Sequence, residues 1–185
     1  MADEDLVLES FHTRGGVKTG VLVRRVSPTS LATLTCFTEP GLLYHVENRV
    51  EFDSDDPFSW THYVHHDGET FLEREHEASD PGDTVPSYAE WLLVHRLLQS
   101  GEREVAFTQL DEGTGETAPA TLVHEADEVV LYIDGRATNR HRVVGDELLA
   151  SDWGGIGSRP VAEMAELVEG LDNQVAVRLR NFVDS

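Results

Sequence analysis

Two segments rich in histidine and glutamate flank an Asp-Gly dipeptide at positions 67–68 and carry the residue types that acid–base chemistry needs. Residues 60–66 read WTHYVHH, and residues 69–75 read ETFLERE. If the dipeptide forms a two-residue turn, His62 lies opposite Glu73 on one face of a hairpin. A carboxylate opposite an imidazole fixes the tautomer of the ring and raises its basicity. His62 and Glu73 are therefore the first catalytic candidates.

The same hairpin could also hold a metal ion, but its spacing argues against this. His62 and His66 would share a face, and four residues of strand separate them by about 13 Å, too far to bind one ion. The neighbouring His65 and His66 would point to opposite faces. We therefore expect no metal. A solvated hairpin with ordinary cross-strand His–Glu pairs remains the alternative.

A second Asp-Gly dipeptide, at positions 134–135, predicts another hairpin from residues 129–133 and 136–144. A two-residue turn would place His141 opposite Glu128, and Arg140 on the face of Val129 and Leu131. An arginine or imidazole inside a cavity can donate a hydrogen bond to a carbonyl, carboxylate or enolate. Arg140 and His141 are thus candidate donors. The alternative remains open that this face is exterior and that its arginines only balance acidic neighbours.

Large aromatic residues recur at positions suited to the wall of a cavity. Tyr44 falls on a strand, Trp91 on the apolar side of a helix, and Trp153 before the glycine-rich loop 154–157, where it could close one mouth of a barrel. The candidate substrate-binding residues are Tyr44, Trp60, Trp91, Tyr132 and Trp153. That glycine loop fits neither dinucleotide nor phosphate-loop fingerprints, and no GxSxG or HExxH motif occurs, so we expect no cofactor.

Alternation of apolar and polar residues at period two dominates the chain and predicts many short antiparallel strands, about nine to twelve in number. The clearest predicted strands are 6–12, 17–26, 31–37, 42–52, 58–66, 69–77, 129–133, 136–144 and 173–182.

Two segments depart from this pattern and predict helices. Ser87 and Glu90 have the spacing of a capping box, and Gly101 supplies a left-handed stop, so a helix is expected over 88–99. Pro160 suits a first helical turn and predicts a second, short helix over 160–169.

The chain has 185 residues, enough for one domain, 1–185, with a core of its own. We predict a mainly β fold, in which a curved antiparallel sheet closes as a lipocalin-like barrel, or remains a half-barrel, with one mid-chain helix and a short C-terminal helix. A helix-grip fold ranks second, because its long helix would occupy the C-terminal segment, which alternates like a strand.

The charge balance excludes classes of partner. The chain holds 35 Asp and Glu against 14 Lys and Arg, a net charge of −21, which disfavours nucleic acids and anionic membranes. Cys36 is the sole cysteine, which fits a reducing compartment, and the acidic first residues do not resemble a signal peptide, so a cytoplasmic protein is expected. Lys18 is the sole lysine, and both a GC-rich genome and salt adaptation remain open as causes of this composition. A homodimer also remains open as the oligomeric state.

The layout of residues 6–182 resembles the small lipocalin-like β-barrel cyclases of bacterial natural-product pathways, the Diels–Alderase type. The resemblance implies a cavity that binds a hydrophobic linear polyketide and promotes an intramolecular [4+2] cycloaddition without a cofactor. Such a cavity holds diene and dienophile close together, and one hydrogen bond to a carbonyl adds to the effect. The resemblance rests on no sequence motif, so two alternatives stay open. They are a non-catalytic carrier of hydrophobic ligands, and an isomerase or hydrolase that uses His62 and Glu73.

Overall fold

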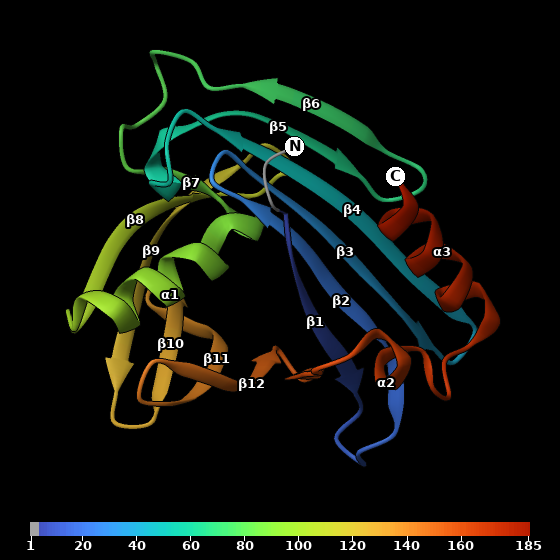
Figure 1. The fold of residues 1–185 in the computed structure, drawn as a ribbon. Helices are drawn as coiled ribbons and strands as arrows, with labels where there is room; N and C mark the ends of the chain where they lie inside the picture. The colour runs from blue at the N-terminus through green and yellow to red at the C-terminus, as the bar shows by residue number, and fades with distance from the viewer. Residues whose placement is uncertain (1–3) are drawn as a thin grey trace.

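Thirteen strands form one strongly curved sheet in the computed structural model, which describes residues 4–185 (Figure 1). The strand order is β6-β5-β4-β3-β2-β1-β13-β12-β11-β10-β9-β8-β7. Neighbours are antiparallel except β7 and β8. The mainly β prediction is confirmed. The strands are β1 (Asp5–His12), β2 (Lys18–Ser27), β3 (Ser30–Glu39), β4 (Leu42–Phe52), β5 (Trp60–His66), β6 (Phe71–Glu75), β7 (Thr84–Pro86), β8 (Glu104–Leu110), β9 (Thr117–Glu125), β10 (Glu128–Ile133), β11 (Arg136–Val144), β12 (Glu147–Trp153) and β13 (Gly157–Pro160).

The sheet is not closed by hydrogen bonds, so the prediction of a closed barrel is wrong and its half-barrel alternative describes the sheet better. The two edge strands are β6 and β7, and β7 has only three residues. Near this gap, the indole Nε1 of Trp60 in β5 donates to the carbonyl oxygen of Thr84 in β7, at 2.9 Å. A side chain of β5, the neighbour of edge strand β6, thus contacts the opposite edge strand β7, where a ladder of backbone hydrogen bonds would close a barrel.

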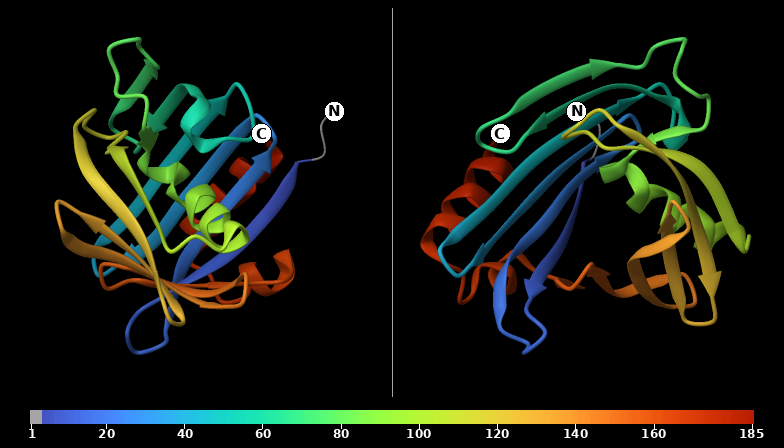
Figure 2. Two further views of the ribbon diagram at one scale, coloured as in Figure 1. Left: turned by 90° about the vertical axis from the view of Figure 1, so that its left-hand side faces the viewer. Right: turned by 180° about the vertical axis from the view of Figure 1, so that it is seen from behind.

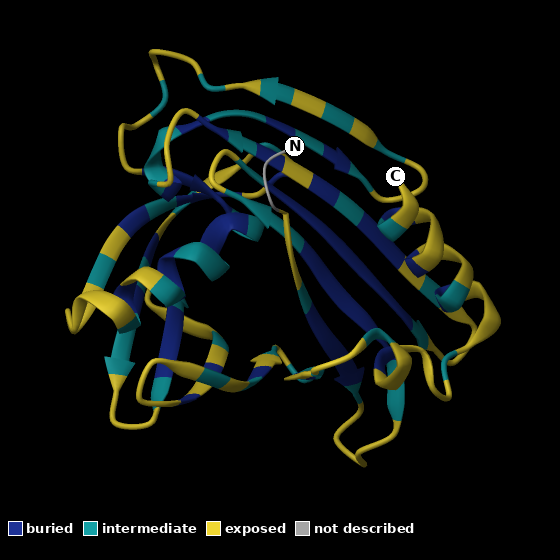
Figure 3. Cartoon of the chain, in the orientation of Figure 1, coloured by how far each residue is buried: buried dark blue, intermediate teal, exposed yellow. Residues whose placement is uncertain are grey.

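Three α-helices lie on two different sides of the sheet (Figure 2). Helix α1 (Glu90–Ser100) lies inside the curve of the sheet, and its buried face packs on the core that β4, β5 and β8 to β10 share. Helices α2 (Met164–Val168) and α3 (Asn173–Asp184) pack on the convex face of β1 to β3. Strands β2 and β3 are therefore covered on both faces, which explains their nearly continuous burial (Figure 3).

The C-terminal segment is a helix, so the strand predicted over 173–182 is wrong. Val175, Leu179 and Phe182 recur at helical spacing and are buried, whereas Val177, which completed the apparent alternation, is 51% exposed. Asp172 caps the helix by accepting from the backbone N–H of Gln174 at 2.8 Å. A helix-grip sheet would wrap around its C-terminal helix, but α3 lies on the convex face.

The second predicted helix, 160–169, shortens to α2, because Pro160 ends strand β13. The mid-chain helix is confirmed, with Gly101 in the left-handed conformation at its end, φ 70°. Its predicted capping box does not form, since α1 has no side-chain cap. A short 3-10 turn, Ser87–Ala89, precedes it, and another, Pro57–Ser59, precedes β5.

Both Asp-Gly hairpins form, but in registers that differ from those predicted. At residues 67–70 the turn has four residues, held by the Asp67 carboxylate, which accepts from the backbone N–H of Glu69 and Thr70, so His62 pairs with Glu75 instead of Glu73. In the second hairpin, a bulge after Leu131 places His141 opposite Val129. A bulge adds one residue to one strand and reverses which side chains face inward beyond it.

Candidate ligand cavity

A cavity of about 480 Å³ is lined by residues of the concave face of the sheet and by Glu90 and Trp91 of helix α1. This volume is in the range of small-molecule sites. Its wall contains six aromatic residues, and the ring of Phe37 stacks on Tyr44 with centroids 4.7 Å apart. The lining residues are Phe11, Leu22, Arg24, Thr35, Phe37, Tyr44, Ser87, Tyr88, Glu90, Trp91, Gln109, Asp111, Ile133, Asn139, Trp153 and Ile156.

A buried arginine on β2 is the first polar group of this wall. Arg24 is 2% exposed, and its Nη1 donates to the Oε1 of Glu9 on β1. The other carboxylate oxygen of Glu9 accepts from the hydroxyl of Ser158, which in turn accepts from the indole N–H of Trp153 at 2.9 Å. The guanidinium carbon of Arg24 lies 5.0 Å from the centroid of the Trp91 ring. These contacts fix a positively charged donor against an aromatic wall.

Three of the five buried side-chain atoms that lack a hydrogen-bond partner in residues 4–185 lie in one row across the strands. They are Nε of Arg24, Oγ1 of Thr33 and Nδ2 of Asn48. Thr33 is the register partner of Arg24 across β2 and β3, and Asn48 is that of Thr33 across β3 and β4. Buried polar groups are rarely left unpaired. Of these three residues, Arg24 lines the cavity, whereas Thr33 and Asn48 do not.

A second polar cluster joins the wall to the interior behind it. The Glu90 carboxylate accepts from Nδ2 of Asn139 at 3.1 Å and lies 3.1 Å from Nε2 of His141. The Nδ1 of His141 lies 2.9 Å from the Ser151 hydroxyl. His141 is fully buried and does not line the cavity itself, so Glu90 is the member of this cluster that faces the ligand space.

A buried glutamate anchors the third polar cluster. The Glu112 carboxylate accepts from the backbone N–H groups of Ser87 and Tyr88, each at 3.0 Å, and from the Ser87 hydroxyl. This contact replaces the predicted capping box and holds Tyr88 in the cavity wall. Burial raises the pKa of Glu112 to about 7, against the opposing effect of these hydrogen bonds. Burial likewise raises the pKa of the Tyr88 phenol, which stays neutral.

We expect Glu112 to make the protein less stable as pH rises from about 5 to 8. Its folded pKa exceeds the unfolded value near 4.5, so its contribution to stability is full below pH 4.5 and is lost as pH passes 7. The loss is about 3 kcal/mol in the free energy of unfolding. Urea unfolding at several pH values should show that the free energy of unfolding falls more steeply with rising pH for the wild type than for Glu112→Gln. The exposed Glu73→Gln variant is the control. Parallel curves for wild type and Glu112→Gln would contradict this assignment.

The structure separates the residues that the sequence grouped as substrate-binding. Tyr44, Trp91 and Trp153 line the cavity. Trp60 does not, since its ring belongs to the core beside β7, and Tyr132 is only half-buried and is not among the lining residues.

Of the two predicted donors, neither reaches the ligand space. Arg140 is exposed and pairs with Glu128 at 3.0 Å, because the bulge after Leu131 turns it outward. The same bulge turns His141 inward, where Glu90 separates it from the cavity.

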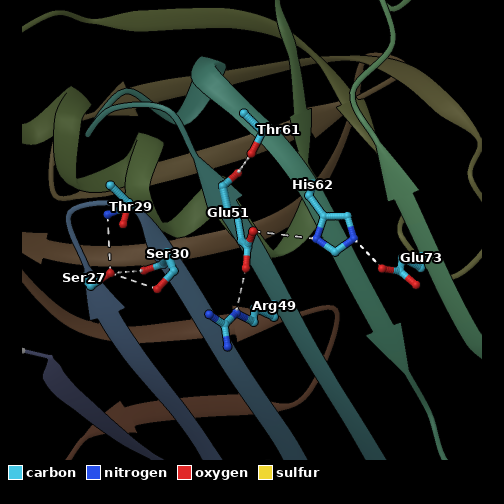
Figure 4. A network of polar contacts seen from close by, with 8 residues as sticks. All are labelled: Ser27, Thr29, Ser30, Arg49, Glu51, Thr61, His62 and Glu73. Atoms are coloured by element: carbon cyan, nitrogen blue, oxygen red, sulfur yellow. Dashed lines mark hydrogen bonds and ion pairs between the residues drawn. The ribbon is translucent and has the colours of Figure 1, made fainter. Parts of the chain in front are cut away.

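His62 and Glu73 do form a pair, with Nε2 and Oε1 2.9 Å apart, but on the outer face of the sheet (Figure 4). Glu51 and Arg49, both on the convex face, extend the pair into a chain of surface charges. Neither His62 nor Glu73 lines the cavity. His62 and Glu73 therefore lie outside this cavity, while the opposite face of β5 is buried through Trp60, Tyr63 and His65.

Sequence reasoning missed Arg24, Glu9, Glu90 and Tyr88. Arg24 carries the clearest signal, because it interrupts an apolar face formed by Leu22 and Val26 on the same strand. Within residues 4–185, no group of three His, Cys, Asp or Glu side chains is arranged to hold a metal ion.

The comparisons with known proteins leave the family of the chain undefined. No family model matches it, and no curated protein matches it. Among solved structures, it is similar to a β-barrel-like protein with a domain of unknown function, DUF1849, from Brucella abortus, at a TM-score of 0.47 and 10% identity, covering 85% of this chain and 94% of that one. In the part of the chain that the structure describes, no helix has the length and apolar character to cross a membrane.

Proposed function

We propose that the protein binds a largely apolar, carbonyl-bearing small molecule in the cavity and promotes its intramolecular [4+2] cyclisation. The observation that carries this proposal is Arg24, a buried cationic residue whose side chain lines an aromatic wall.

The ligand group that fits Arg24 best is a neutral carbonyl. Glu9 already neutralises the guanidinium, and Glu90 adds a second carboxylate to the same wall. An anionic ligand would meet this negative charge, whereas a ketone, ester or amide oxygen accepts a hydrogen bond and brings no charge into the interior.

Cyclisation in such a cavity needs no cofactor. A conjugated diene and an alkene activated by the carbonyl form two carbon–carbon bonds, and no atom leaves the molecule. Aromatic walls that hold both ends of a flexible chain together remove much of the entropic barrier. Arg24 stabilises the partial negative charge that grows on the carbonyl oxygen as the bonds form.

The test uses 1,7,9-decatrien-3-one, a linear trienone that can close to a bicyclic ketone. With excess protein, chromatography should show product forming at least 10 times faster than in buffer. Glu73→Gln, on the outer hairpin, should behave as the wild type does. Binding of the trienone without acceleration would instead indicate a carrier, and absence of binding would refute the proposal entirely.

A further inference from the structure

Glu90 has the surroundings of a functional carboxylate, although cyclisation by confinement does not require one. It is the first residue of helix α1, it lines the cavity, and it is 2% exposed. The N-terminal end of a helix favours a negative charge. Asn139 and His141 each contact one oxygen of the carboxylate. An ionised carboxylate accepts about four hydrogen bonds, so acceptor positions remain for a ligand.

His141 is held at both ring nitrogens. Its Nδ1 lies against the Ser151 hydroxyl, its Nε2 lies against Glu90, and the edge-to-face ring of Trp153 packs on it with centroids 5.1 Å apart. A serine that donates to Nδ1 leaves the proton on Nε2, which then donates to Glu90. Ser151, His141 and Glu90 thus form a chain of buried hydrogen bonds that ends at the cavity.

We propose that Glu90 transfers protons to and from the bound ligand, with His141 and Asn139 as positioning residues. The inference rests on the proposed function, because the carbonyl held by Arg24 acidifies its neighbouring C–H bonds. In the step, a C–H bond adjacent to the carbonyl breaks and its proton moves to a Glu90 oxygen. The electron pair forms a C=C bond, and the carbonyl oxygen becomes an enolate oxygen that accepts from Arg24.

Returning the proton to a different carbon of the conjugated system completes an isomerisation, with no oxidant or cofactor. The substrate class is therefore enolisable, unsaturated ketones. Such a step would move a double bond into conjugation and supply the diene or dienol that a cyclisation consumes. The cavity would then carry out two consecutive reactions on one ligand.

The test probe is 5-nitrobenzisoxazole, a planar compound that opens when a base removes its ring C–H proton. The proton goes to the base, and the C–H electron pair forms the third bond of a nitrile. The N–O bond breaks with its electron pair on oxygen, which gives a coloured nitrophenolate. General bases contribute about 100- to 10,000-fold in enzyme sites. We expect kcat for the wild type to exceed that of Glu90→Gln by at least 100-fold.

Two variants separate chemistry from loss of structure. Glu90→Asp retains a carboxylate and should restore part of the rate that Glu90→Gln loses. His141→Gln should lower kcat about 10-fold or more while KM changes little, which general damage to the fold would not do. Glu73→Gln is the control on the outer hairpin and should match the wild type.

Quenching of tryptophan fluorescence measures binding of the probe. This measurement separates failure of the proton-transfer role from failure of the proposed function. If the probe binds but Glu90→Gln opens it as fast as the wild type does, the proton-transfer role is overturned and the proposed binding function stands. If neither the probe nor 2-acetylnaphthalene binds, the proposed function fails and this inference falls with it.

Discussion

Replacing Arg24 by Met destabilises the protein by about 3–5 kcal/mol, because the substitution leaves Glu9 as a buried charge without its partner. The double variant Glu9→Gln/Arg24→Met removes both charges and recovers most of this loss, since buried ion pairs can be exchanged for neutral side chains of similar size. Urea unfolding of the two single variants and the double variant gives the coupling energy.

The folded double variant then tests the role of Arg24 in binding. Wild-type protein should bind 2-acetylnaphthalene about 10- to 100-fold more tightly than 2-ethylnaphthalene, because a hydrogen bond to a charged group contributes about 1.5–3 kcal/mol. The double variant should bind both compounds alike. The carboxylate 2-naphthoate should bind the wild type more weakly than the ketone does. Equal affinities of the wild type for ketone and hydrocarbon would exclude Arg24 as the carbonyl donor.

Replacing Trp60 by Ala should have the largest effect among the apolar residues, about 3–5 kcal/mol in the free energy of unfolding. The side chain is fully buried, packs edge-on against His76 with centroids 4.6 Å apart, and donates to Thr84 across the open seam of the sheet. Its loss removes both the packing and the hydrogen bond that join β5 to β7.

Hydrogen exchange locates this effect. Relative to the wild type, Trp60→Ala should speed exchange at the amides of β7 and β8 more than at those of β2 and β3, which are covered on both faces of the sheet. Trp60→Phe keeps most of the packing but leaves the Thr84 carbonyl without its indole donor. The free energy of unfolding of this variant should therefore fall by about 1–3 kcal/mol. Phe71→Ala, at an exposed site on the neighbouring strand β6, is the matched control and should change little. Uniform exchange in all variants would show that the seam has no special role.

Strand existence followed from sequence because it depends on local alternation. The strand 42–52 has the predicted bounds, and both Asp-Gly turns occur where they were expected. Register did not follow, since extra residues in a turn or bulge change no local preference. The first turn holds two residues more than predicted, and the single extra residue in the bulge after Leu131 reverses the faces beyond it. That single difference exchanged Arg140 and His141 between surface and interior.

The C-terminal helix shows a second limit. Val175, Val177 and Leu179 satisfy period two, while Val175, Leu179 and Phe182 satisfy the helical period, and only packing on the convex face selects between them. The sequence of the C-terminal segment itself does not indicate that the convex face of β1 to β3 is apolar and needs a helix to cover it.

The site was only partly predictable for a related reason. Aromatic size alone indicated Tyr44, Trp91 and Trp153, which all line the cavity. The polar groups were missed because their meaning comes from partners distant in sequence, such as Glu9 for Arg24 and His141 for Glu90. An isolated arginine or glutamate in a strand or helix is usually a surface residue, and only the fold reveals that these are buried.

The most direct test of the account is the Nε–H NMR signal of Arg24 during titration with 2-acetylnaphthalene, assigned by its absence from the Glu9→Gln/Arg24→Met variant. We expect the signal to move downfield in proportion to bound ketone, because the Arg24 guanidinium lines the cavity and would donate to the carbonyl oxygen. Titration with 2-ethylnaphthalene should leave it nearly unchanged. A ketone that binds in the cavity without moving this signal would contradict the central claim that Arg24 receives the ligand carbonyl.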